Sequence, residues 1–276
     1  MTQNINGLSK KQAEFLSHLA AEGKNLFSIQ QAHAYWGSPA YTANVLSRLV
    51  QKGWLRRLER GVYMLLPLAA GRERVWSESG YPTSLDKCVI AAHLIQPAAV
   101  AYWSALHYWN MTEHIPGVVF VQSTRRKRPL EVLGMRFRFV SVKEAHFFGV
   151  IQRTVDGKPI YVTNREKTLL DAAARPDLSG GIAQLAQALQ AAHSDINWQR
   201  LDDYLVRWGG GVVVKRLGYL LERLALPIPD RKTRLEQWQN MLSAGISTLE
   251  PGMAARGRTV TRWRVRVNVD VEQFKR

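Results

Sequence analysis

The fold of the N-terminal region is decided by two consecutive stretches, SPAYTANVLSRL at residues 38–49 and KGWLRRLERGVYML at residues 52–65. The first predicts a helix, because Ser38 is a good N-cap and Pro39 takes the first helical position, where a missing N–H costs nothing. The second predicts two short strands around the tight connection Glu59-Arg60-Gly61. A helix followed by a small basic hairpin is typical of a winged helix-turn-helix.

Two shorter helices are expected before these stretches. Ser9 is a good N-cap for a helix that Gly23 ends, and Ser28 caps a second helix that stops near Gly37. With them, residues 8–66 make one compact module, whose main use is to place one helix in the DNA major groove.

The helix after Ser38 has the residue types of a recognition helix. Val45, Leu46 and Leu49 are expected to face inward, which leaves several polar side chains outside. Asparagine pairs with adenine and arginine with guanine, while threonine and tyrosine contact a thymine methyl group or a phosphate. The helix N-terminus can also receive a phosphate. The alternative is an ordinary polar helix face. The candidate DNA-binding residues on this helix are Ser38, Tyr41, Thr42, Asn44 and Arg48, with Asn44 and Arg48 expected to read bases.

The hairpin adds a second set of candidates. Arg56, Arg57 and Arg60 cluster at or near its tip. A wing that carries arginines runs along a phosphate backbone or enters a minor groove. These three residues are therefore predicted to hold DNA phosphates or a minor groove.

The composition agrees with a nucleic-acid partner. The chain has 276 residues, with 38 Lys and Arg against 22 Asp and Glu, and a formal net charge of +16. Such a balance favours polyanions, although a basic solvated surface without a partner is the alternative. Cys88 is the single cysteine, which predicts a buried structural thiol in a cytoplasmic protein. Neither a signal peptide nor a membrane-spanning run is visible, and no membrane partner is expected.

The pattern changes after the hairpin. We expect a winged helix-turn-helix domain over residues 1–80, with a connector at 67–82, and a C-terminal domain over 81–276. The C-terminal domain reads as mixed α/β (α+β), with a small sheet and several helices. Helices are expected at 85–95, 98–109, 165–174, 181–192, 198–208, 212–224 and 234–242, and strands at 118–121, 137–140, 147–151, 160–162 and 261–269.

A second basic surface is predicted in the C-terminal domain. One part is a run of four cations after a strand, and the other is a set of arginines that alternate on the late strand and so share one face. Together they favour contact with DNA beside the operator or with RNA, against the alternative of a solvated face. The residues are Arg125, Arg126, Lys127 and Arg128, with Arg262, Arg264 and Arg266.

Nothing in the sequence favours catalysis or a cofactor. Acidic residues are scattered, with Asp202-Asp203 read as a solvated helix face and Glu166 as a favourable charge near a helix N-terminus. The histidines lack metal-ligand spacing. We therefore expect no enzyme, metal or cofactor. A metal-dependent nuclease is one rival interpretation, and a ligand-sensing regulator with an aromatic pocket around Tyr102, Trp103 and Trp109 is another.

Four stretches together resemble the AbiEi family, the antitoxins of type IV toxin–antitoxin systems that act in abortive infection. They are RLERGVY at 57–63, AYWSALHYW at 101–109, VTNREKTLLD at 162–171 with the following Gly180-Gly181, and KRLGYLLE at 215–222. The resemblance spans most of residues 8–225 and does not cover the tail after about Leu226.

The resemblance implies a two-domain protein. Its N-terminal domain would be a transcriptional repressor that binds double-stranded DNA at repeated half-sites in its own promoter. Its C-terminal domain would oppose a co-encoded nucleotidyltransferase toxin without a stable complex between the two proteins.

Overall fold

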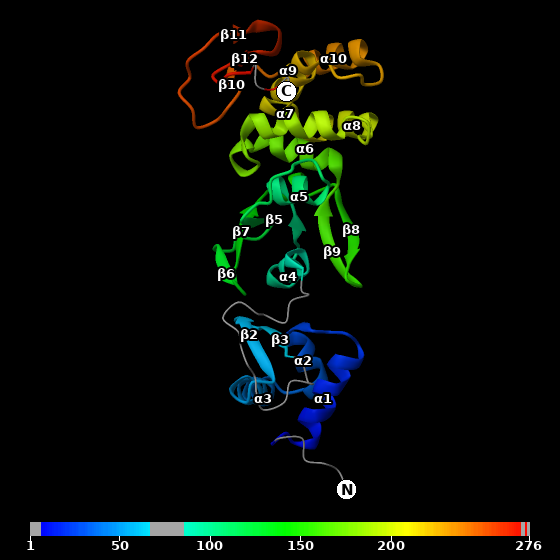
Figure 1. The fold of residues 1–276 in the computed structure, drawn as a ribbon, viewed down its shortest axis with the longest axis vertical. Coiled ribbons are helices and arrows are strands. Elements are labelled where there is room, and N and C mark those ends of the chain that lie inside the picture. Colours follow the sequence, from blue (N-terminus) through cyan, green and yellow to red (C-terminus); the bar gives the residue numbers. More distant parts are fainter. Residues whose placement is uncertain (1–6, 67–85, 272–273, 275–276) are drawn as a thin grey trace.

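A computed structural model describes residues 7–66, residues 86–271 and residue 274. The predicted connector and domain boundary near residue 80 fall within residues 67–85, outside this part of the chain. Figure 1 shows the described part as an elongated stack with the N-terminal module at one end. The mixed α/β class and the small N-terminal and larger C-terminal regions are as predicted.

The N-terminal module is a winged helix-turn-helix. Its elements are α1 (Lys10–Ala21), β1 (Leu26–Ser28), α2 (Ile29–Trp36), α3 (Pro39–Gln51), β2 (Leu55–Glu59) and β3 (Val62–Leu65). The strands form an antiparallel sheet in the order β1-β3-β2. Phe15, Leu46 and Leu49 lie in the core beneath the sheet. The helices and the hairpin strands predicted from apolar spacing in this module are therefore present in the structure.

The three predicted N-cap positions are confirmed, and two of them have a side-chain capping hydrogen bond. Ser9 and Ser28 each accept a hydrogen bond from the backbone three residues on, and Gln12 and Gln31 complete capping boxes. Ser38 is the N-cap residue of α3 with Pro39 following, as predicted, but its side chain makes no capping hydrogen bond. Its backbone carbonyl instead accepts the Thr42 hydroxyl at 2.7 Å.

A six-stranded mixed sheet forms the centre of the C-terminal domain. The strands are β4 (Ala99–Val100), β5 (Val118–Ser123), β6 (Leu130–Val132), β7 (Met135–Ser141), β8 (Val150–Val155) and β9 (Lys158–Thr163), in the order β6-β7-β5-β4-β9-β8. Two helices, α4 (Lys87–Leu94) and α5 (Tyr102–Tyr108), flank β4. The helix predicted from residue 98 therefore begins later, and the strand predicted at 147–151 lies mostly at 150–155.

A layer of helices covers one end of this sheet (Figure 1). It contains α6 (Arg165–Ala174), α7 (Gly181–Ala192), α8 (Trp198–Trp208), α9 (Val212–Leu224) and α10 (Arg231–Asn240). Two short 3-10 turns accompany them: η1 (Glu144–His146) precedes β8, and η2 (Pro176–Leu178) lies between α6 and α7. Helix α6 is central because α5, α7, α8 and α9 all pack against it. Its residues Leu169, Leu170, Ala172 and Ala173 are fully buried. Among the described residues, no helix is long and apolar enough to cross a membrane.

The strand predicted over residues 261–269 is wrong. The tail instead forms β10 (Ser247–Thr248), β11 (Thr259–Val260), the 3-10 turn η3 (Thr261–Trp263) and the two-residue β12 (Val265–Arg266). The Trp263 ring is fully buried against Gly218 of α9, and its indole donates to Glu222 at 2.7 Å. The 3-10 turn ends at Arg264, which adopts a positive φ of 51°. The alternation of the three arginines on one strand face is thereby lost.

The two domains are packed against each other. Leu26 and Met64 of the winged helix share a hydrophobic core with Val89 and Ile90 of α4. This apolar contact places the sheet of the winged helix against α4.

Candidate nucleic-acid interface

Helix α3 presents the predicted polar face, with one exception. Ser38, Tyr41, Asn44 and Arg48 are exposed, and Tyr41 as a whole residue is 45% exposed. Ser47 is exposed beside them. These side chains project from one face of α3 and carry hydrogen-bonding groups suited to base edges and phosphates.

Thr42 is the exception, and its predicted outward position is wrong. The side chain is fully buried, and its hydroxyl donates a hydrogen bond to the Ser38 carbonyl. Thr42 lies three, four and seven residues before Val45, Leu46 and Leu49, so it belongs to the apolar stripe. That spacing was visible in the sequence, and the polar residue type concealed it. Thr42 is therefore removed from the candidate DNA contacts.

The hairpin forms as predicted, with a positive φ of 81° at Gly61. Its register shifts between Arg57 and Glu59, which marks an irregularity beside the turn. Arg57 and Arg60 are exposed, and Arg56 is partly exposed. The Arg57 Nε donates to the Glu59 carbonyl at 3.3 Å, which holds this guanidinium along the hairpin.

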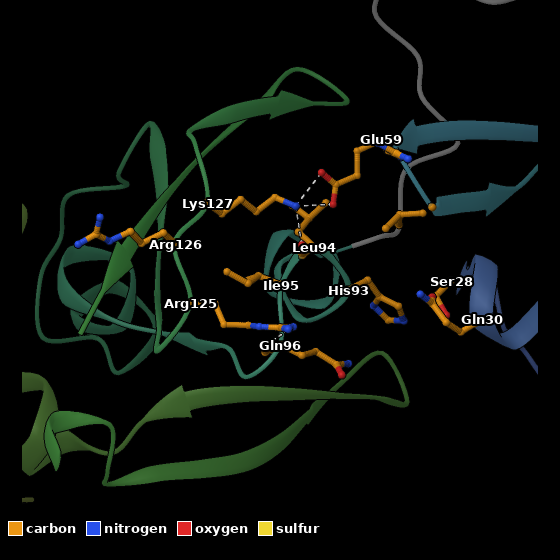
Figure 2. Close-up of a pocket in the computed structure, with 13 residues that line it drawn as sticks. Ser28, Gln30, Glu59, His93, Leu94, Ile95, Gln96, Arg125, Arg126 and Lys127 are labelled. Carbon is orange, nitrogen blue, oxygen red and sulfur yellow. Dashed lines mark hydrogen bonds and ion pairs between the residues drawn. The ribbon is translucent and has the colours of Figure 1, made fainter. Parts of the chain in front are cut away.

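The turn of the hairpin faces the C-terminal domain, which the sequence did not predict. Lys127 Nζ lies 2.6 and 2.7 Å from the two Glu59 carboxylate oxygens and 2.6 Å from the Leu94 carbonyl (Figure 2). Glu59 and Lys127 are 68 residues apart, and no local pattern marks a pair at that separation. The Lys127 ammonium group is thus engaged by partners within the protein.

The predicted second basic surface is divided between two ends of the C-terminal domain. Residues 125–128 follow β5 at the end near the winged helix, and β12 lies at the far end (Figure 1). Arg262 pairs with Glu222 at 3.1 Å, Arg264 donates to the Ser243 carbonyl and Arg266 donates to the Ala255 carbonyl. One continuous arginine-lined face over both sets is therefore contradicted, while Arg125, Arg126 and Arg128 are exposed.

A buried polar cluster lies under the C-terminal sheet. Lys167 forms an ion pair with Asp171 on the next turn of α6, and Gln122 of β5 donates to Asp171 and to Tyr102. Burial raises the pKa of Asp171 and lowers the pKa of Lys167, and the ion pair opposes both shifts. Lys167 also lies 5.0 Å from the Phe148 ring centroid. The cluster ties α6 to the sheet.

The aromatic residues of the ligand-sensing interpretation are used in packing. Tyr102 is 2% exposed and accepts the Gln122 amide, while the Trp109 indole donates to the Thr163 carbonyl at 2.8 Å. Trp103 stacks on His114, with ring centroids 4.4 Å apart. The hydrogen bonds of Tyr102 and Trp109 join elements of the fold.

Of two acidic residues considered earlier, Glu166 lies in the first turn of α6 as predicted, whereas Asp202 is mostly buried and does not belong to a solvated helix face. Glu166 accepts the Asn197 backbone N–H at 2.9 Å, and Asp202 accepts the Trp238 indole at 2.7 Å and the Arg234 guanidinium. Both therefore join helices inside the domain. Within residues 7–66 and 86–271, no group of three or more His, Cys, Asp or Glu could hold a metal ion. The absence of enzymatic activity stays a prediction.

Comparison with known proteins agrees with this architecture. The fold is that of a winged-helix protein with a larger C-terminal α/β region. Residues 14–66 match the family model described as "Transcriptional regulator, AbiEi antitoxin", which confirms the resemblance to the AbiEi family over the winged helix. The whole chain is similar in fold to the crystal structure of the RV2827C protein from Mycobacterium tuberculosis, with a TM-score of 0.63, 13% identity, and coverage of 94% of this chain and 92% of that chain.

Proposed function

We propose that this protein binds double-stranded DNA through α3 and represses transcription of its own operon. The observation that carries the proposal is the exposed face of α3, where Tyr41, Asn44 and Arg48 project from a winged-helix scaffold that matches a regulator family. Asn44 and Arg48 contact base edges, while Arg57 and the first turn of α3 contact phosphates. The target is a set of repeated half-sites in the promoter.

The same proposal includes an antitoxin role. The protein opposes a nucleotidyltransferase toxin without a stable complex with it, and this part rests on the family resemblance alone. The proposed nucleic-acid partner is double-stranded DNA, and contact of the C-terminal domain with RNA stays a prediction from the sequence.

The DNA proposal is tested by fluorescence anisotropy with the DNA upstream of the gene and with an unrelated duplex, at several salt concentrations. The variant is Asn44→Ala with Arg48→Ala, and the matched control is Lys232→Ala, an exposed cation on α10 far from the winged helix. Each lost base contact should weaken binding to the operator by about 1–3 kcal/mol. The control should bind as the unmodified protein does.

The salt dependence separates base reading from general attraction. Loss of base contacts removes the preference for the operator, whereas loss of a phosphate contact weakens all duplexes together and lowers the salt slope by about one. If the protein binds both duplexes with the same weak affinity, and the double variant binds them equally well, α3 is not a recognition helix.

A further inference from the structure

A cleft of about 580 Å³ lies between the winged helix and the C-terminal domain, and Glu59 and Lys127 are among its lining residues. The winged helix contributes the hairpin turn and the start of α2, and the C-terminal domain contributes the end of α4 and residues 125–127. Helix α3 contributes none of the lining residues, so this cleft is distinct from the proposed base-reading face.

The cleft is strongly cationic. Glu59 and Lys127 neutralise each other, and their side chains are only 20% and 21% exposed. Arg60 and Arg125 line the cleft, as does Arg126, whose side chain is directed away from the interior, and within the described part of the chain none of the three pairs with a carboxylate. The lining therefore carries a net positive charge that a cleft between low-dielectric walls concentrates.

Two of these arginines come from different domains. Arg60 is at the hairpin turn, and Arg125 Nη1 lies 3.4 Å from the Gln96 carbonyl at the end of α4. Figure 2 shows Arg125 directed toward the α4 side of the cleft, whereas Arg126 is directed away from it. His93 also faces the cleft, and its Nδ1 is engaged by the Val89 carbonyl at 3.0 Å, which orients the ring.

We propose that this cleft binds a phosphate-bearing ligand, with the phosphoryl oxygens held between Arg60 and Arg125. Guanidinium groups match phosphate in charge and in bidentate hydrogen-bond geometry. The volume lies within the range of small-molecule sites, about 300–1,000 Å³. A free nucleotide-sized anion therefore fits inside, whereas a DNA duplex could offer only a backbone phosphate at the rim.

The test uses the full chain at fixed ionic strength, with ATP and inorganic pyrophosphate as probes in isothermal titration calorimetry. The variants are Arg60→Ala, Arg125→Ala and the pair together. The matched control is Arg128→Ala, which removes an exposed cation from the same segment outside the cleft lining. Circular dichroism checks that each variant is folded. We expect all of them to fold, because the substituted arginines are exposed.

Each cleft variant should weaken probe binding about tenfold, and Arg128→Ala should leave it nearly unchanged. A second arm measures a short duplex by anisotropy. If neither probe binds but the cleft pair weakens duplex binding more than Arg128→Ala does, the phosphate is that of the DNA backbone. No effect of the cleft variants in either arm, or an equal effect of Arg128→Ala, overturns the proposal. The α3 variant tests base reading separately, so the two failures are distinguishable.

Discussion

The winged helix and the C-terminal domain place their polar residues in opposite ways. In the winged helix the core is apolar, and Gln12 and Thr42 are its buried polar residues among those the structure describes. The core of the C-terminal domain contains buried charged side chains, including Lys167, Asp171 and Arg216. Among the described residues, a charged side chain therefore indicates exposure in the winged helix and fails to indicate it in the C-terminal domain.

The buried ion pair of α6 should give the largest effect of this difference. Lys167→Ala leaves the Asp171 carboxylate buried without its partner, and breaking such a pair costs about 3–5 kcal/mol. Urea denaturation followed by tryptophan fluorescence measures the change in the free energy of unfolding. The exposed Lys232→Ala should stay within about 0.5 kcal/mol of the unmodified protein.

A second variant separates lost charge pairing from lost packing. Lys167→Met with Asp171→Leu removes both charges and keeps apolar volume, so it should be more stable than Lys167→Ala alone. A double variant as unstable as the single one would show that packing of the lysine stem, rather than the stranded carboxylate, determines the cost.

The same difference explains how much of the fold could be predicted. The winged helix follows from apolar spacing, caps and a turn glycine, which are all local signals. In the C-terminal domain, most helices and the strands at 118–123 and 135–141 follow likewise. The polar interior does not, because a buried charge is recognisable only by its partner.

Arg216 illustrates this limit. Its guanidinium donates to the Ala173 carbonyl at 2.8 Å and to the Leu249 carbonyl at 3.0 Å, joining α9 to α6 and to the tail. Burial lowers its pKa to about 10. The sequence marks Arg216 only as a cation within a family-like stretch. The candidate site shows the same limit, since the exposed face of α3 was predictable and the Glu59–Lys127 contact that creates the cleft was not.

A smaller effect tests local signals inside the winged helix. Ser9→Ala removes a hydrogen bond to the Gln12 backbone and should cost about 1 kcal/mol. Ser38→Ala removes a side chain without a capping hydrogen bond, so it should cost clearly less. Thermal unfolding of the two variants measures this difference. Equal losses would mean that residue type at the N-cap, and not the observed hydrogen bond, sets the stability of these helices.

The smallest effect concerns Cys88, where the two regions meet. Burial, followed by the nearby Asp86 carboxylate, raises the pKa of the Cys88 thiol. Cys88 also belongs to the core that α4 shares with Leu26 and Met64 of the winged helix. A thiol reagent such as Ellman's reagent should therefore label the native protein far more slowly than the urea-unfolded chain, because the thiolate is the reactive form.

The labelling rate also reports whether the two domains stay packed. Met64→Ala opens the contact with α4 and should accelerate labelling, while Leu49→Ala, in the separate core of the winged helix, should accelerate it less at equal loss of stability. Rapid labelling of the unmodified protein under native conditions would contradict a lasting contact between the winged helix and α4. The cleft beside that contact would then exist only part of the time, and its affinity for a phosphate ligand would fall in proportion to the docked fraction.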